Sequence, residues 1–189
     1  MLMDSSITLR KETLQKYMNP VFLETGTFKG GGVKLALSCG FSKIVSIEID
    51  PTLHSAVDKE FDSLGNVFIH LGDSVRELPF LLQFIKDPIT FWLDAHIQES
   101  AVVGNYPVPL IQELEVLKKY RHGMHDTIMV DDRRLFGKGG YWKDIQEADI
   151  IILLQDINPD NQIICEDSNA AEKDILVSWY KLDVGESNV

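Results

Sequence analysis

The feature that most constrains the fold of this chain is a regular alternation of short β-rich runs with longer amphipathic stretches. The short runs are apolar, and the stretches between them repeat apolar residues at helical spacing, as Leu53, Val57 and Phe61 do. This alternation is typical of a parallel sheet covered by helices. The predicted parallel strands are Val21 to Thr25, Lys43 to Glu48, Asn66 to Leu71, Ile89 to Leu93 and Thr127 to Val130.

Two further strands are predicted near the C-terminus, at Gln162 to Cys165 and Asp174 to Tyr180. The polar link between them is short, so we expect an antiparallel hairpin. With 189 residues, 44% of them hydrophobic, the chain is long enough for one packed core, and we expect a single domain. Its expected parts are an N-terminal helical extension over 1–20, a core over 21–136, and a C-terminal helix and hairpin over 137–189.

Composition excludes several classes of partner. The chain has 18 basic and 29 acidic residues, a formal charge of −11, so phosphate backbones are repelled and nucleic acid is not an expected partner. No run approaches the roughly 20 apolar residues of a membrane span. Met1 to Arg10 lacks the pattern of a signal peptide, so we expect a cytoplasmic protein without a membrane partner. Cys39 and Cys165 form no ligand or redox pattern and are expected to be idle.

Two of the predicted strands end in acid. Ile89 to Leu93 leads into Asp94-Ala95-His96, and Thr127 to Val130 leads into Asp131-Asp132. Ligands of open α/β sheets bind beyond the carboxyl ends of the strands, so these side chains are expected to converge. Three carboxylates and an imidazole suit a hard divalent cation with a proton acceptor nearby. The alternative is ion pairing, because Arg133-Arg134 follows the second pair of acids directly.

A glycine-rich loop follows the first strand, where Glu24-Thr25-Gly26-Thr27 leads through Phe28-Lys29 to Gly30-Gly31-Gly32. Glycines let the backbone turn sharply and approach a ligand, and the helix that follows presents free N–H groups. The spacing differs from the G-x-G-x-x-G of dinucleotide-binding proteins and favours a different nucleoside ligand. A merely structural turn is the alternative.

The second and third strands also end in polar residues. Glu48 ends the second strand, where an acid can accept hydrogen bonds from both ribose hydroxyls. The third strand runs into Gly72-Asp73-Ser74, where the aspartate could accept from the exocyclic amine of a base. The alternatives are that Glu48 is an ordinary solvated acid and that Asp73 only caps the helix that begins at Ser74.

Together these motifs resemble those of class I S-adenosylmethionine-dependent methyltransferases. The Glu-Thr-Gly turn with its aromatic-basic-Gly-Gly continuation is similar to the metal-dependent sugar O-methyltransferases of the macrocin type. Asp94 with Asp131-Asp132 is also similar to catechol O-methyltransferase. The resemblance covers roughly Val21 to Phe136. It implies a Rossmann-like, three-layer α/β/α fold with a seven-stranded, mostly parallel sheet whose last strand is antiparallel.

The resemblance implies roles for individual residues. It places Mg²⁺ on Asp94, Asp131 and Asp132, and a general base at His96, where the sugar enzymes usually carry an aspartate. A neutral imidazole is a reasonable substitute, since its unperturbed pKa is about 6.5. The residues implied to bind S-adenosylmethionine are Glu24, Thr25, Gly26, Thr27, Gly30, Glu48, Asp73, Ser74 and Asp94.

The predicted function is S-adenosylmethionine-dependent, Mg²⁺-assisted methylation of a hydroxyl on a sugar or other small polyol. The expected partner is a small-molecule or glycan acceptor, and a homo-oligomer stays open. Tyr106, Tyr141 and Trp142, on loops at the ligand side, suit stacking on a sugar face. The alternatives are a catechol-like acceptor, an NAD-dependent oxidoreductase, and a non-catalytic nucleoside-binding module.

Overall fold

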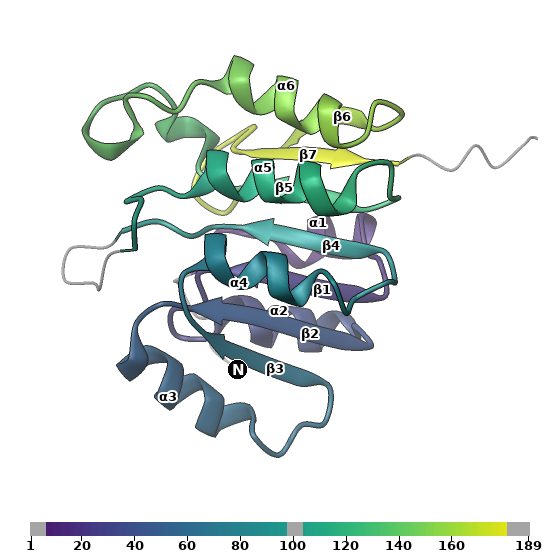
Figure 1. Ribbon diagram of the computed structural model, residues 1–189, viewed down its shortest axis with the longest axis vertical. Helices are drawn as coiled ribbons and strands as arrows, with labels where there is room; N and C mark the ends of the chain where they lie inside the picture. The colour runs from purple at the N-terminus through teal and green to yellow at the C-terminus, as the bar shows by residue number, and fades with distance from the viewer. Residues whose placement is uncertain (1–6, 98–103, 181–189) are drawn as a thin grey trace, which may run out of the picture.

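A computed structural model describes residues 7–97 and 104–180 of the chain (Figure 1). Within these ranges seven strands alternate with six α-helices and two short 3₁₀ helices. The strands are β1 Val21–Thr25, β2 Lys43–Glu48, β3 Val67–Leu71, β4 Ile89–Leu93, β5 Thr127–Val130, β6 Gln162–Glu166 and β7 Ile175–Trp179. The helices are α1 Lys11–Lys16, α2 Gly31–Cys39, α3 Pro51–Phe61, α4 Ser74–Leu81, α5 Leu110–Arg121, η1 Arg133–Leu135, η2 Gly140–Trp142 and α6 Glu147–Ile157.

The seven strands described form one sheet in the order β3-β2-β1-β4-β5-β7-β6. The first five strands run parallel, and β7 pairs antiparallel with both β5 and β6. The predicted sheet and its C-terminal hairpin are therefore confirmed, and the strand ends differ from the predicted ones by one residue at most. In Figure 1 the β7 arrow points opposite to those of β1 to β4.

The strand register brings the predicted site residues to one edge of the sheet. Thr25 at the end of β1 pairs with Leu93 at the end of β4, and Leu93 pairs with Val130 at the end of β5. On the other side of β1, Thr25 pairs with Ile47, one residue before Glu48. The loops that follow β1, β2, β4 and β5 therefore start side by side.

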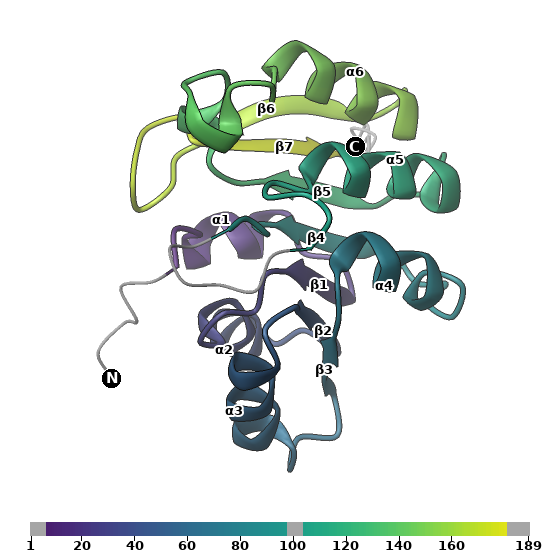
Figure 2. The same cartoon turned by 60° about the vertical axis from the view of Figure 1, so that its left-hand side comes forward.

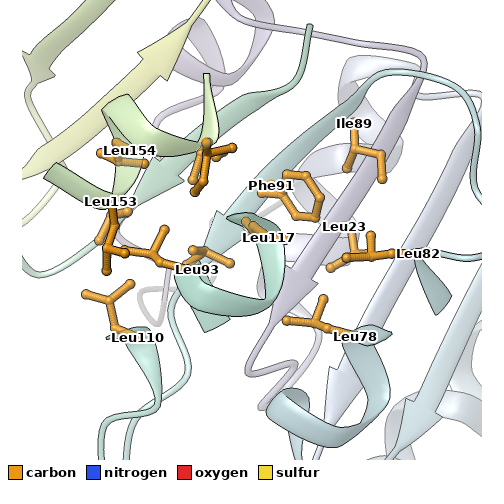
Figure 3. Close-up of a cluster of buried hydrophobic side chains, with 14 of the residues drawn as sticks. Leu23, Leu78, Leu82, Ile89, Phe91, Leu93, Leu110, Leu117, Leu153 and Leu154 are labelled. Carbon is orange, nitrogen blue, oxygen red and sulfur yellow. The ribbon is translucent and has the colours of Figure 1, made fainter. Parts of the chain in front are cut away.

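Both faces of the sheet are covered by helices, and alternate strand residues face opposite layers. Leu23, Phe91 and Ile128 belong to the core cluster packed under α4, α5 and α6, part of which is drawn in Figure 3. Phe22, Trp92 and Met129 belong to the cluster under α1, α2 and α3. Figure 2 shows the two helical layers on opposite sides of the strands.

The N-terminal segment belongs to the second of these layers. The predicted helical extension over 1–20 contains one described helix, α1, and Leu9, Leu14 and Tyr17 around it are buried in the cluster under α1 to α3. Trp92 lies in the same cluster, as its position inside a strand predicts. Within the described ranges, no helix has the length and apolar character needed to cross a membrane.

Candidate active site

A cavity of about 580 Å³ opens at the carboxyl ends of the parallel strands. Its size is that of a typical small-molecule site. The cavity is continuous from the end of β2 to the end of β5. Of the residues predicted for the site, those that line it are Gly26, Glu48, Asp73, Ser74, Asp94, His96, Asp131 and Asp132.

The β1 loop approaches the β4 loop closely at Gly26. Gly26 has φ +86°, and a Cβ there would lie 3.0 Å from the carbonyl oxygen of Asp94. The backbone N–H groups of Gly26 and Thr27 both donate to the carbonyl of Ile47, at 3.0 and 3.2 Å. A side chain at position 26 would therefore push the loops apart, which is the reason for glycine at this turn.

Glu24 points to the amino end of α2 and not into the large cavity. Ser46 donates a hydrogen bond of 2.7 Å to its carboxylate, and a Cβ on Gly32 would lie only 1.7 Å from its Oε2 atom. Burial raises the pKa of Glu24 to about 8. With Thr27, Gly26 and Asp94 it lines a separate small cavity of about 30 Å³.

Glu48 is held rigidly at the end of β2. Its Oε2 accepts from the backbone N–H of Phe28 at 2.7 Å, and its Oε1 accepts from that of Asp50 at 2.9 Å. Each carboxylate oxygen keeps a second lone pair. Glu48 is thus an oriented acceptor on the cavity wall and not a freely solvated acid, because only 5% of it is exposed.

Asp73 caps a helix, as the alternative interpretation of the sequence predicts, and it also lies on the cavity wall. Its Oδ1 accepts from the backbone N–H of Val75 at 3.0 Å and so caps α4. Its Oδ2 points to the β4–α5 loop, where the backbone N–H of Asn105 donates to it at 3.3 Å. Asp73 and Ser74 both line the cavity, so the cap can also contact a ligand.

Two predicted cofactor residues lie outside both cavities. Thr25 is fully buried and, because strand residues alternate, faces the α4–α5 layer opposite to Glu24. Gly30, with φ +75°, is the N-cap of α2, and a Cβ there would meet Phe61 at 3.1 Å and Val57 at 3.2 Å. Gly30 therefore lets α2 pack against α3, and any effect of these two residues on a ligand is indirect.

Behind Thr25 lies a buried acid that sequence reasoning missed, Glu113 of α5. It is 1% exposed, and its Oε1 has no hydrogen-bond partner among the described residues. Burial raises the pKa of Glu113 from 4.5 to about 7, against the opposing effect of the nearby Ser74 and Thr25 hydroxyls. The sequence could have revealed this burial, because Glu113 lies at helical spacing from Leu110, Leu114 and Leu117. An acid on that apolar face is buried together with the leucines.

The raised pKa of Glu113 makes the free energy of unfolding depend on pH. The folded state keeps Glu113 protonated up to about pH 7, whereas the unfolded chain loses this proton near pH 4.5. Protonated Glu113 thus adds to the free energy of unfolding. This addition is fully present below pH 4.5 and is lost as pH rises through 7. We expect Glu113→Gln to remove roughly 3 kcal/mol of the loss in unfolding free energy between pH 4 and 8. Urea titrations of both proteins across this range measure it, and parallel pH profiles would refute it.

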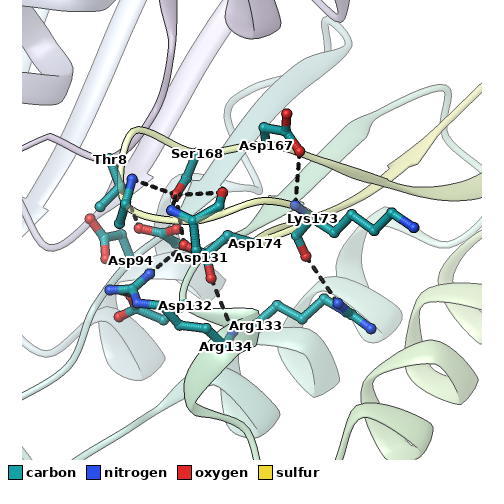
Figure 4. A network of polar contacts seen from close by, with 12 residues as sticks. Thr8, Asp94, Asp131, Asp132, Arg133, Arg134, Asp167, Ser168, Lys173 and Asp174 are labelled. Carbon is teal, nitrogen blue, oxygen red and sulfur yellow. Dashed lines mark hydrogen bonds and ion pairs between the residues drawn. The ribbon is translucent and has the colours of Figure 1, made fainter.

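The acids at the tips of β4 and β5 form the other end of the cavity (Figure 4). Burial raises the pKa of Asp94 well above its ordinary value, and the charges of Asp131 and Asp132 raise it further. Burial also raises the pKa of Asp131, to about 6. The Thr8 hydroxyl donates to Asp131 Oδ2, while Asp131 Oδ1 is buried without a partner in the described part of the chain. This end of the cavity is therefore suited to a cation.

The two arginines after these acids have different partners. Arg133 pairs with Glu147 at 2.9 Å, away from the acids. Arg134 pairs with Asp132 Oδ1 at 2.6 Å and with the buried Asp174. Asp132 has φ +60°, and its second oxygen, Oδ2, points away from Arg134 to His96. The arginines therefore bind only one of these acids, through the Oδ1 atom of Asp132. Asp94 has no arginine partner among the described residues.

His96 lies between Asp94 and Asp132. Its Nε2 is 3.2 Å from Asp132 Oδ2 and 3.8 Å from Asp94 Oδ1, and its Nδ1 is 3.2 Å from the carbonyl oxygen of Ile97. Burial lowers the pKa of His96, but the hydrogen bond and charge of Asp132 outweigh this and raise it above its ordinary value. The ring is thus fixed at both nitrogens.

The predicted aromatic residues are placed unequally. Tyr106 lines the cavity. Trp142 packs edge-on against the His96 ring, with centroids 5.7 Å apart, and stacks on Phe136. Tyr141 is 60% exposed and does not line the cavity. Of the three predicted aromatic residues, Tyr106 thus lies on the cavity wall and Trp142 packs beside the acid end.

No protein-family model matches the sequence, and no curated protein matches it. Solved structures do share its fold. The Bacillus cereus O-methyltransferase in complex with S-adenosylhomocysteine (SAH) is 16% identical, with a TM-score of 0.62 over 90% of this chain and 78% of that one. The SAH-bound Podospora anserina methyltransferase PaMTH1 is 13% identical, with a TM-score of 0.59 over 90% of this chain and 76% of that one.

A third structure is that of the O-methyltransferase TomG from Streptomyces achromogenes, involved in tomaymycin synthesis, in complex with S-adenosylmethionine. It is 17% identical, with a TM-score of 0.58 over 90% of this chain and 77% of that one. At these identities the likeness is one of fold. The chain therefore has the Rossmann-like fold found in S-adenosylmethionine-dependent methyltransferases, as its sequence motifs predict.

Proposed function

We propose that this chain is an S-adenosylmethionine-dependent methyltransferase that methylates a hydroxyl oxygen of a sugar or other small polyol with the help of a divalent cation. One observation carries the proposal: a single cavity joins Glu48 and Asp73 at one end to Asp94, Asp131 and Asp132 at the other. A nucleoside methyl donor and a hydroxylated acceptor must bind side by side in one cavity. Methyl transfer requires the acceptor oxygen to lie in line behind the methyl carbon.

The donor end has groups for each part of S-adenosylmethionine. Glu48 would accept from the ribose hydroxyls with lone pairs that Phe28 and Asp50 leave free. Asp73 and Ser74 would contact the adenine, and Gly26 would let the methionine part approach the backbone. S-adenosylmethionine, when bound, supplies a methyl group on a sulfonium with an excellent leaving group. The task left to the protein is orientation and removal of a proton.

The acid end would hold the acceptor. Carboxylates at Asp94 and Asp132, with Asp131 behind them, fit a divalent cation. The observation that supports this fit is the buried Asp131 Oδ1, which has no hydrogen-bond partner among the residues that the structure describes. A divalent cation, when bound, supplies charge that lowers the pKa of a hydroxyl. Two groups on the wall can take the hydroxyl proton: His96, as the sequence predicts, and Asp131.

Charge favours an uncharged acceptor. The acid end carries Asp94, Asp131 and Asp132 with one arginine, Arg134, on the cavity wall. A bound divalent cation and Arg134 would offset the charge of the three carboxylates, so the site would keep no excess positive charge to attract a phosphorylated or carboxylated acceptor. Vicinal hydroxyls suit a cation held by carboxylates, and Tyr106 offers a ring to one face of a sugar. We therefore propose a neutral polyol as the acceptor, with a catechol as the alternative.

The donor half of the proposal is tested by calorimetry with SAH. We expect the wild-type protein to bind SAH and not NADH, and Glu48→Gln to weaken SAH binding by about 10- to 100-fold, since hydrogen bonds to a charged group are lost. Glu60→Gln, an exposed acid on α3, is the matched control and should bind like wild type. Binding of NADH alone would establish the oxidoreductase alternative instead.

The acceptor half is tested with labelled S-adenosylmethionine and a panel of neutral glycosides, polyols and catechols. Transfer of label to a polyol, abolished by EDTA and restored by a divalent cation, is the expected result. Transfer to catechols alone would replace the acceptor class. SAH binding without transfer to any acceptor, together with unchanged binding in acid-end variants, would favour a non-catalytic nucleoside-binding module.

A further inference from the structure

The ring of His96 is oriented so that its Nε2 atom faces two carboxylates. Its Nδ1 lies 3.2 Å from the carbonyl oxygen of Ile97. A carbonyl oxygen can only accept a hydrogen bond, so Nδ1 carries the hydrogen. In the neutral ring the lone pair is then on Nε2. The Nε2 atom itself lies 3.2 Å from Asp132 Oδ2 and 3.8 Å from Asp94 Oδ1.

Positive charge between Nε2 and these two oxygens can come from a proton on Nε2 or from a cation bound by all three atoms, and the geometry of the cluster points to the cation. The three atoms all lie within 4.8 Å of one another. Around a cation with bonds of about 2.1 Å, neighbouring ligand atoms are about 3.0 Å apart in octahedral and about 3.4 Å in tetrahedral geometry. The separations of 3.2 and 3.8 Å from Nε2 are close to this range.

The surroundings hold these donors in place. A metal-ligating histidine usually donates its other ring N–H to a carbonyl or carboxylate, as Nδ1 of His96 does to Ile97. Arg134, itself fixed by the buried Asp174, binds Asp132 Oδ1 and so turns Oδ2 to the ring. Asp131 lines the same cavity, is 3% exposed, and has an Oδ1 without a partner in the described ranges. This buried oxygen is a second, independent observation that points to a cation at this end of the cavity.

We propose that His96 is a metal ligand, and that Asp94 Oδ1, Asp132 Oδ2 and His96 Nε2 together select a first-row transition dication over Mg²⁺. This inference rests on the proposed function, which places a divalent cation at the acid end of the cavity. It differs from that proposal in the residues that bind the cation. Imidazole nitrogen suits transition ions, whereas Mg²⁺ prefers oxygen ligands and binds nitrogen poorly. The predicted set of three aspartates has no such preference.

The experiment uses the full chain with Co²⁺ and Mg²⁺ as probes in calorimetry, and the visible absorption of bound Co²⁺ as a second readout. We expect wild type to bind Co²⁺ at least about tenfold more tightly than Mg²⁺. His96→Ala should weaken Co²⁺ binding by about 10- to 100-fold and alter the Co²⁺ spectrum, because a nitrogen donor is replaced by water. Mg²⁺ and SAH affinities should change little.

Two variants make the result specific. His96→Asp exchanges the nitrogen donor for oxygen and should shift the preference to Mg²⁺, which a loss of folding would not do. His125→Ala removes an exposed histidine that stacks on Tyr180 and should leave Co²⁺ binding unchanged. If His96→Ala keeps the affinity and spectrum of bound Co²⁺, His96 is not a ligand, and a loss of turnover in that variant would then support the general-base role.

The outcomes separate this inference from the proposed function. A wild-type protein that binds SAH but neither cation would overturn the metal site and leave methyl transfer as the proposed activity. A protein that binds Co²⁺ through His96 but does not bind SAH would keep the ligand assignment and refute the methyltransferase.

Discussion

The Asp94→Asn variant is expected to lose methyl transfer by roughly 100- to 1,000-fold and to keep its fold. Asp94 directly follows β4, and it lines both cavities. A cation that stabilises developing charge contributes several kcal/mol, and each 1.4 kcal/mol is about a factor of ten in rate. Asparagine has the same shape but removes one of three like charges, so the thermal midpoint should not fall.

Label transfer from S-adenosylmethionine measures this variant, with thermal unfolding followed in parallel. Asp58→Asn, an exposed acid on α3, is the matched control and should keep full activity. Turnover of Asp94→Asn within about threefold of wild type, which is under 1 kcal/mol, would remove Asp94 from the reacting site. A fall in the thermal midpoint would instead identify Asp94 as a structural acid.

Most of the sheet could be predicted because its central strands are buried on both faces. Every residue of β1, β4 and β5 is buried, so each appears in the sequence as a short, mostly apolar run bounded by polar loops, interrupted only by Glu24 and by threonines. The acids that end these runs could be placed at one edge for the same reason. The β3 prediction began one residue early, at Asn66, which lies outside the strand at the exposed edge of the sheet.

The contacts that shape the site could not be predicted because they join distant parts of the chain. Thr8 donates to Asp131, 123 residues away, and Arg134 binds Asp174, 40 residues away. No local pattern marks either pair. Thr25 shows a different limit, since its place in the glycine-rich motif suggests a ligand contact, whereas strand alternation turns its side chain to the opposite layer.

Arg121→Met is expected to lower the free energy of unfolding by about 3–5 kcal/mol, the usual cost of leaving a buried charge without its partner. Arg121 ends α5, is 1% exposed, and binds Asp126 through two hydrogen bonds of 2.6 and 2.7 Å. It also donates to the carbonyls of Ile85 and Asp87, and Asp126 accepts from the backbone N–H of Ile89. Its loss would therefore leave a buried carboxylate and two carbonyls unpaired at the amino ends of β4 and β5.

Urea unfolding of Arg121→Met measures the effect, and Lys118→Met is the matched control. Lys118 lies on the same helix and pairs with Asp156 at a similar distance, 2.8 Å, but this pair is exposed. Exposed ion pairs are solvated and screened, so the control should unfold close to wild type.

Because small domains are stable by only about 5–15 kcal/mol, the loss in Arg121→Met is large enough to lower its urea midpoint clearly. Equal midpoints for the two variants would mean that burial adds nothing to the Arg121–Asp126 pair. Arg121→Met should still bind SAH at low temperature, since Ile85, Asp87 and Ile89, which hydrogen-bond to the Arg121–Asp126 pair, are not among the described residues that line the cavity.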